Sequence, residues 1–250
     1  MAKRRRNENN IVDSILTMLV SLIGWIIIIF FRLICFIYDV ISFYTSGYKQ
    51  KSGTSFFKTY FNKGLYGEFC LYRKVCRLFG KAFVLTNIYL DSINTETTEI
   101  DVLSISNKGI YVYEMKNYSG FIYGSETDKQ WTQVLNKWTK NKFYNPLRQN
   151  YAHTKAIEKF LDVCEQQIFP IVVFSNRSKL SKISITKDQN VFQYRDAIRF
   201  VKNKEKYHLN QITDKQKETY LVKLLTRTKM TDEFKEKHIE EIKMLREKKS

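Results

Sequence analysis

The chain has few of the residues that build disulfide scaffolds, zinc sites and tight loops. Its 250 residues include only four cysteines, three histidines and two prolines, and no Cys-x-x-Cys pair occurs. So few cysteines exclude the disulfide framework of a small secreted domain. With so few histidines, neither a zinc site nor a Cys–His catalytic pair is expected. We expect the cysteines to be buried free thiols.

Acidic residues are also scarce relative to basic ones. The sequence has 42 Lys and Arg against 25 Asp and Glu, which gives a net charge of +17. This excess favours a polyanionic partner, either nucleic acid or an anionic membrane face, and composition does not choose between them. The hydrophobic content of 44% supports a core for one domain with appendages.

Charge is absent from residues 14–31, SILTMLVSLIGWIIIIFF. This run of about 18 residues predicts a single transmembrane helix, which we place at residues 11–38 with the Arg32 side chain reaching toward the membrane surface. A buried core helix is the alternative. A signal peptide fits poorly, because the apolar run is long and no small-x-small cleavage site follows it. Residues 1–10 are polar and basic and are expected to be disordered.

The topology of this helix stays open. The basic residues at positions 3–6 predict an N-terminus on the inside, which places the globular part outside. Free cysteines and a domain that seeks polyanions fit the cytoplasm better. We therefore favour a single-pass membrane protein whose globular part faces the cytoplasm.

Residues 99–116 combine charged side chains with sequence typical of β-strands. Residues 99–105 and 109–116 are rich in β-branched and aromatic residues, and Ser106-Asn107-Lys108-Gly109 supplies the turn between them. A turn centred between Asn107 and Lys108 places Asp101 directly opposite Glu114. The pattern predicts a β-hairpin with two facing carboxylates.

Lys116 shares a face of this hairpin with Glu114, because side chains alternate along a strand. Two carboxylates about 5 Å apart repel each other by roughly 3 kcal/mol at an effective dielectric constant of about 20. This repulsion favours a neutralising divalent cation, and oxygen ligands suit Mg²⁺ or Mn²⁺. The alternative is a structural Asp/Glu/Lys cluster, since ion pairs mimic functional sites.

The segments around the hairpin predict an α/β core. Residues 39–63 resemble a linker, and an amphipathic helix follows, with Glu68 in its first turn. The helix dipole alone explains an acid there as well as a function does. Asn145-Pro146 opens a second helix, on which Gln149 and His153 share a face. Strands are expected at residues 82–90, 121–123, 169–175 and 191–192, and residues 177–250 are expected to form a charged, largely helical extension.

Residues 64–176 also contain a series of short phrases in a fixed order: Gly67-Glu68, Asn87-Ile88-Tyr89-Leu90, Glu99-Ile100-Asp101, Gly109-Ile110-Tyr111-Val112, Glu114-Met115-Lys116-Asn117, Gly120 with Ile122 and Gly124, Trp131-Thr132-Gln133, Asn145-Pro146 with Gln149-Asn150 and His153, and Val172-Val173-Phe174-Ser175. In this order they resemble the nuclease-related domain (NERD) family. The resemblance implies an α/β, restriction-endonuclease-like core of the PD-(D/E)xK type, with a central mixed sheet flanked by helices.

The resemblance also implies roles for individual residues. One departure is that Ile100 stands where the motif's proline precedes the acid. The implied roles are metal binding by Asp101, Glu114 and the backbone carbonyl of Met115, and catalysis by Lys116 together with Asp101, Glu114, Glu68 and Gln149.

The function expected from these features is a membrane-anchored, Mg²⁺-dependent nuclease that hydrolyses phosphodiester bonds of nucleic acid, with DNA favoured. The alternative is a nucleic-acid-binding or scaffolding module that keeps the fold without turnover. A third reading makes the basic surface a lipid-facing patch. The sequence indicates no protein partner.

Overall fold

The computed structural model of the chain describes residues 2–91 and 97–231, together with residues 233, 236, 238–240, 243 and 244. It divides into two compact units, Met1–Thr45 and Ser46–Ser250.

The first unit is one long helix, α1 (Ala2–Thr45). It begins at Ala2, whereas we expected residues 1–10 to be disordered. Alanine, lysine and arginine are strong helix formers, and lengthening an existing helix needs no new nucleus. The stretch Ser14–Thr45 is long and apolar enough to cross a membrane.

The second unit is built on a mixed five-stranded sheet in the order β1-β2-β3-β7-β9. The first three strands run antiparallel, and β3, β7 and β9 run parallel. This sheet and its flanking helices confirm the expected α/β core. The strands are β1 (Val84–Asp91), β2 (Thr97–Ser106), β3 (Gly109–Lys116), β7 (Ile168–Phe174) and β9 (Val191–Gln193).

Strands β2 and β3 form the expected hairpin in the expected register. Val102 lies opposite Tyr113, so Asp101 and Glu114 are the next positions along the two strands. There the ladder changes, because the backbone N–H of Met115 donates to the Asp101 carboxylate at 3.0 Å. A side chain therefore replaces a backbone acceptor where the two acids meet.

A second, four-stranded sheet has the order β6-β5-β4-β8. Only β4 was expected; β6 and β8 are rich in lysine, which has low β-propensity, and their pairing in the sheet overrides it. Trp131 anchors the sheet by stacking on Phe174 of the first sheet. The strands are β4 (Gly120–Ser125), β5 (Gln130–Val134), β6 (Lys140–Tyr144) and β8 (Ser178–Ser184).

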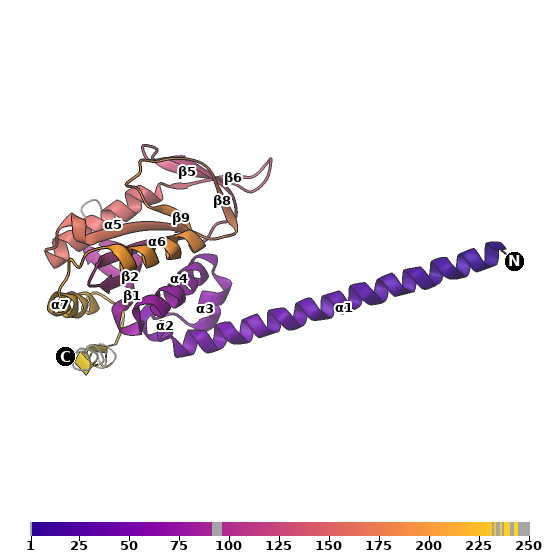
Figure 1. Cartoon of the computed structure of the whole chain (residues 1–250), viewed down its shortest axis with the longest axis horizontal. Helices are drawn as coiled ribbons and strands as arrows, with labels where there is room; N and C mark the ends of the chain where they lie inside the picture. Colours follow the sequence, from indigo (N-terminus) through magenta and orange to yellow (C-terminus); the bar gives the residue numbers. More distant parts are fainter. Residues whose placement is uncertain are drawn as a thin grey trace. The chain divides into compact units, whose positions relative to one another are not determined.

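Helices cover both faces of the mixed sheet (Figure 1). Phe79 of α4 packs against Tyr111 of β3, whereas Ile157 of α5 joins the core cluster that holds the neighbouring Val112. Asn145 caps α5 by accepting from the Leu147 N–H, as the Asn145-Pro146 pair predicted. The described helices of this unit are α2 (Tyr48–Ser52), α3 (Phe56–Phe61), α4 (Lys63–Phe79), α5 (Pro146–Leu161), α6 (Tyr194–Tyr207) and α7 (Asp214–Leu225), with short 3-10 turns at Lys81–Phe83 and Glu165–Gln167.

Two segments, and the burial of the cysteines, differ from what the sequence suggested. Within residues 39–63, α2 and α3 form because Tyr48 and Phe56 bury their rings. Strand β8 lies in the segment expected to be largely helical, whereas β9 matches the strand expected at residues 191–192. The four cysteines are free, but the expectation that they are buried is wrong, since Cys35 and Cys164 are exposed and the other two are partly exposed. Most of the charged helix expected near the C-terminus lies outside the described residues.

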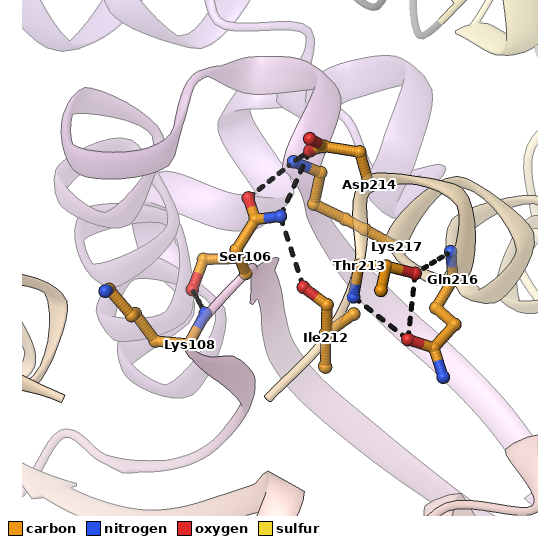
Figure 2. A network of polar contacts seen from close by, with 8 residues as sticks. Ser106, Lys108, Ile212, Thr213, Asp214, Gln216 and Lys217 are labelled. Carbon is orange, nitrogen blue, oxygen red and sulfur yellow. Dashed lines mark hydrogen bonds and ion pairs between the residues drawn. The ribbon is translucent and has the colours of Figure 1, made fainter. Parts of the chain in front are cut away.

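Residues far along the chain hold the turn of the β2–β3 hairpin (Figure 2). The side-chain amide of Asn107 donates to the carbonyl of Ile212 at 3.2 Å and to Asp214 at 3.1 Å. Lys217 donates to the Asn107 side-chain oxygen at 2.9 Å, and the backbone N–H of Ile212 donates to the Asn107 carbonyl. These bonds fix the turn that sets the hairpin's register.

Candidate active site

Glu114 is the buried centre of the site, with only 1% of its surface exposed. One of its oxygens lies 2.6 Å from the ammonium of Lys116, as alternation along β3 predicted. Nε2 of His153 donates to the other oxygen at 2.9 Å. Nδ1 of His153 lies 2.8 Å from the hydroxyl of Thr98. Each carboxylate oxygen of Glu114 therefore has a partner.

Helix α5 supplies two contacts to this centre. Lys116 donates to the side-chain oxygen of Gln149 at 3.0 Å, and His153 holds Glu114. The two α5 residues are four positions apart, so they lie on one face of the helix, as expected. Lys116 is consequently fixed by one carboxylate and one amide.

Asp101 faces this centre from β2. One of its oxygens accepts the Met115 N–H. Burial and then the charges of Glu114 and Glu68 raise the pKa of Asp101 well above its ordinary value, against the smaller lowering by the Met115 hydrogen bond and by Lys116. The protonated form of Asp101 is therefore favoured unless further positive charge is present.

Glu68 joins the acids from helix α4. Its neighbour Gly67 lets the helix approach the end of β3, since a Cβ on Gly67 would lie 2.6 Å from the Cβ of Asn117. Burial, with repulsion from Glu99 and Glu114, raises the pKa of Glu68 to about 7. Glu68 therefore changes charge near neutral pH.

Glu114 and Lys116 behave in the opposite way. Burial would raise the pKa of Glu114, but His153 and Lys116 together lower it below its ordinary value. Burial would lower the pKa of Lys116, but Glu114 raises it overall. The pair is therefore ionised, next to two acids whose pKa values are raised.

The chemistry of these donors suits a hard divalent cation. Asp101, Glu68 and Glu114 supply carboxylate oxygens, the ligands that Mg²⁺ and Mn²⁺ prefer. Two of them have raised pKa values because they are buried and because neighbouring acids repel them, and a cation would relieve this repulsion. Within the part of the chain that the structure describes, however, no three His, Cys, Asp or Glu side chains form a ready-made metal site. Glu114 would have to exchange a partner to bind a cation.

Sequence reasoning did not identify several residues around the acids. It noted His153 but not its bond to Glu114, which the four-residue spacing from Gln149 could have suggested. Asn87 has a left-handed backbone with φ 53° and donates to Glu99 at 2.6 Å; asparagine tolerates this conformation better than most residues. Burial, then the charges of Glu68 and others, raise the pKa of Tyr48, which no pattern in the expected linker had marked.

Comparisons with known proteins identify the family of this segment. Residues 63–175 match the sequence model of the nuclease-related domain. An uncharacterized protein of Bacillus anthracis, pXO1-01, is 33% identical over 181 residues, which cover 71% of this chain and 82% of that protein. A solved structure of a protein of unknown function, AF1548, is 17% identical with a TM-score of 0.25 and covers 74% of this chain and 98% of its own.

Proposed function

The chain belongs to the nuclease-related domain (NERD) family, and from this premise we propose that it is a membrane-anchored, Mg²⁺-dependent nuclease. It would hydrolyse phosphodiester bonds of nucleic acid, and DNA is the first substrate to test. The observation that carries the proposal is the arrangement at the end of the β2–β3 hairpin. An ionised Glu114–Lys116 pair lies beside Asp101 and Glu68, whose pKa values are raised.

The acids would hold the metal. Asp101 and Glu114 would bind it through side-chain oxygens, and Met115 through its backbone carbonyl. The N–H of Met115 points toward Asp101, and the N–H and C=O of one strand residue point to the same edge. When bound, Mg²⁺ supplies Lewis acidity to a phosphate oxygen and lowers the pKa of a water.

Lys116 would act on the reacting groups directly. Its ammonium is held by Glu114 at 2.6 Å and by Gln149 at 3.0 Å, so its position is fixed before substrate arrives. A fixed positive charge can orient an attacking water or stabilise the negative charge that develops on the phosphate. Gln149 is a positioning residue in this scheme, and Glu68 adds negative charge for the cation.

Helix α1 would be the membrane anchor. Its apolar side chains are exposed along the helix, with Trp25 and Ile29 both 62% exposed. Burying such side chains in lipid is favourable by about 25 cal/mol per Å² of apolar surface. We place the catalytic unit on the cytoplasmic side, where its free cysteines stay reduced.

Cleavage of DNA by the full-length protein in detergent micelles tests this proposal. We expect cleavage with Mg²⁺, none in EDTA, and its loss in Asp101→Asn, which keeps the side chain's size but removes its charge. Circular dichroism would establish that the variant folds. Equal cleavage by the variant and the wild type, or cleavage in EDTA, would overturn the assignment.

A binding or scaffolding module without turnover is the second candidate. The favouring observation is that both oxygens of Glu114 already have partners, Lys116 and His153, so the centre can be stable as an ion-pair network. Salt-sensitive DNA binding without cleavage in Mg²⁺ or Mn²⁺ would select this function. Failure to bind DNA at low salt would exclude it.

A further inference from the structure

The second sheet has one buried side and one side that faces solvent. On the buried side, Ile122, Trp131 and Phe143 pack against Phe174 of the mixed sheet. Because side chains alternate along a strand, the residues between them point outward. We call these outward residues of β4, β5, β6 and β8 the basic sheet face.

The strand pairing arranges the basic sheet face in rows. A one-residue bulge in β8 keeps its outward positions aligned with those of β4. The first row is Lys140, Val134, Phe121 and Lys179, and the second is Lys142, Thr132, Tyr123 and Lys182.

Lysine therefore stands at both ends of each row, with aromatic residues between. Strands lie about 4.8 Å apart, so the two lysine columns are separated by roughly 14 Å. Phe121 is 43% exposed between them, and Tyr144 on β6 is 49% exposed. The face is a strip of aromatic rings bordered by ammonium groups.

The outward positions of these strands carry no carboxylate, as the rows and the remaining pairs Tyr144–Gln130 and Ser125–Ser184 show. Among the described residues, none of the four lysines forms an ion pair. Lys155 and Lys217, by contrast, pair with acids on their own helices. Positive charges gathered on one face without acids to neutralise them attract anions, so the face is complementary to a polyanion.

The aromatic strip distinguishes between kinds of polyanion. Exposed rings can stack on unpaired bases, whereas the bases of a duplex are already stacked on one another. The turn between β5 and β6 presents a further ring, Trp138, which is 86% exposed and has Lys137 above it. Rings flanked by cations match the way proteins hold single strands, with bases on the rings and phosphates on the lysines.

We propose that the basic sheet face binds single-stranded nucleic acid, with bases stacked on Phe121 and Tyr123 and phosphates paired with Lys140, Lys142, Lys179 and Lys182. The site is built on a different sheet from the acids and captures the strand without cutting it. The inference rests on the proposed function only in treating that strand as the nuclease's substrate.

Binding of a fluorescently labelled oligothymidylate, measured in EDTA with the full-length protein in detergent micelles, tests this proposal. The test variant replaces the four lysines by glutamine (K140Q, K142Q, K179Q and K182Q). A matched control removes the same charge from four exposed lysines on α6 and α7 (K202Q, K206Q, K215Q and K223Q). We expect at least tenfold weaker binding in the test variant, a salt slope lower by about 3, and little change in the control.

A second, milder variant separates stacking from charge. Phe121→Ala with Tyr123→Ala should weaken oligothymidylate binding severalfold and leave duplex binding unchanged. Equal weakening of oligothymidylate binding by the lysine test variant and its control would overturn the proposal. So would equal weakening of single-strand and duplex binding by the variant that lacks the Phe121 and Tyr123 rings. The proposal would also be overturned if the lysine variant lost its binding to short-chain phosphatidylserine but kept its binding to the oligonucleotide. That result would assign the face to lipid.

These measurements do not depend on catalysis. If the oligothymidylate binds as expected but no DNA is cleaved with Mg²⁺, the proposed nuclease function fails and the binding face stands. If cleavage occurs while the lysine variant binds normally, the binding face fails and the nuclease stands.

Discussion

The two sheets of this protein place their charges in opposite surroundings. In the mixed sheet, Glu114 and Lys116 are largely buried, close together and of opposite sign, with Asp101 next to them. In the second sheet, Lys140 and Lys142 are exposed and face no acid. Buried opposite charges hold one another in a fixed geometry, whereas exposed like charges attract mobile anions. One sheet is suited to chemistry and the other to capture.

Lys116→Ala should have the largest effect, on the cleavage rate that depends on the mixed sheet. Removing the fixed ammonium leaves developing charge on the phosphate unsupported, and we expect the cleavage rate to fall about 10²–10³-fold. Lys155→Ala, which removes a partly exposed lysine of α5, is the control and should cleave normally. Initial rates with labelled DNA give the comparison, and equal rates for the two variants would remove Lys116 from the catalytic centre.

His153→Ala tests the buried sheet through stability. Glu114 would lose its partner at 2.9 Å and remain buried, and breaking such a pair costs about 3 kcal/mol. Lys142→Ala, at an exposed position, should leave the free energy of unfolding almost unchanged. Urea unfolding of both variants measures this difference. A His153→Ala protein as stable as wild type would show that Glu114 does not depend on the imidazole.

Glu68→Gln should reveal the crowding of the acids through its pH dependence. The folded pKa of Glu68 is about 7, above its ordinary value, so the folded state binds the proton more tightly. Its contribution to stability is present below about pH 4.5 and is lost as pH rises through about 7. Glutamine cannot ionise, so the variant should gain on the order of 1 kcal/mol over wild type near pH 8, and little near pH 5. Urea unfolding in EDTA measures this gain, and an equal gain at both pH values would show that Glu68 is not crowded.

Lys142→Ala should produce the smallest effect, on salt dependence alone. One lost phosphate contact should lower the slope of log affinity against log salt concentration by about 0.7 for a single strand. Lys202→Ala on α6 is the matched control and should leave the slope unchanged. Fluorescence anisotropy at several salt concentrations provides the slopes, and identical values for both variants would mean that the second sheet captures no better than the rest of the surface.

The buried site was predictable because local rules determine it. Alternation along β3 joined Glu114 to Lys116, the turn at Asn107-Lys108 set Asp101 opposite Glu114, and helical spacing paired Gln149 with His153. Each rule needs only a short window of sequence.

The second sheet was not predictable in the same way. Strand β8 pairs with β4 across more than fifty residues, with Ile122 opposite Leu180. No local pattern specifies such a partner, and the lysines of β6 disfavour a strand when read alone. Tyr48 was missed for a related reason, because its surroundings come from α4 and the mixed sheet.

The bonds at Asn107 have a consequence for the order in which the protein is made. Lys217, which holds the turn's side chain, follows Asn107 by 110 residues. A ribosome adds roughly 5–20 residues per second, so the hairpin waits several seconds or longer for this partner during synthesis. The segment that matches the family model ends at residue 175, so its translation is complete before Lys217 is added. The nascent chain therefore contains every acid of the site before it can lock the hairpin that aligns them.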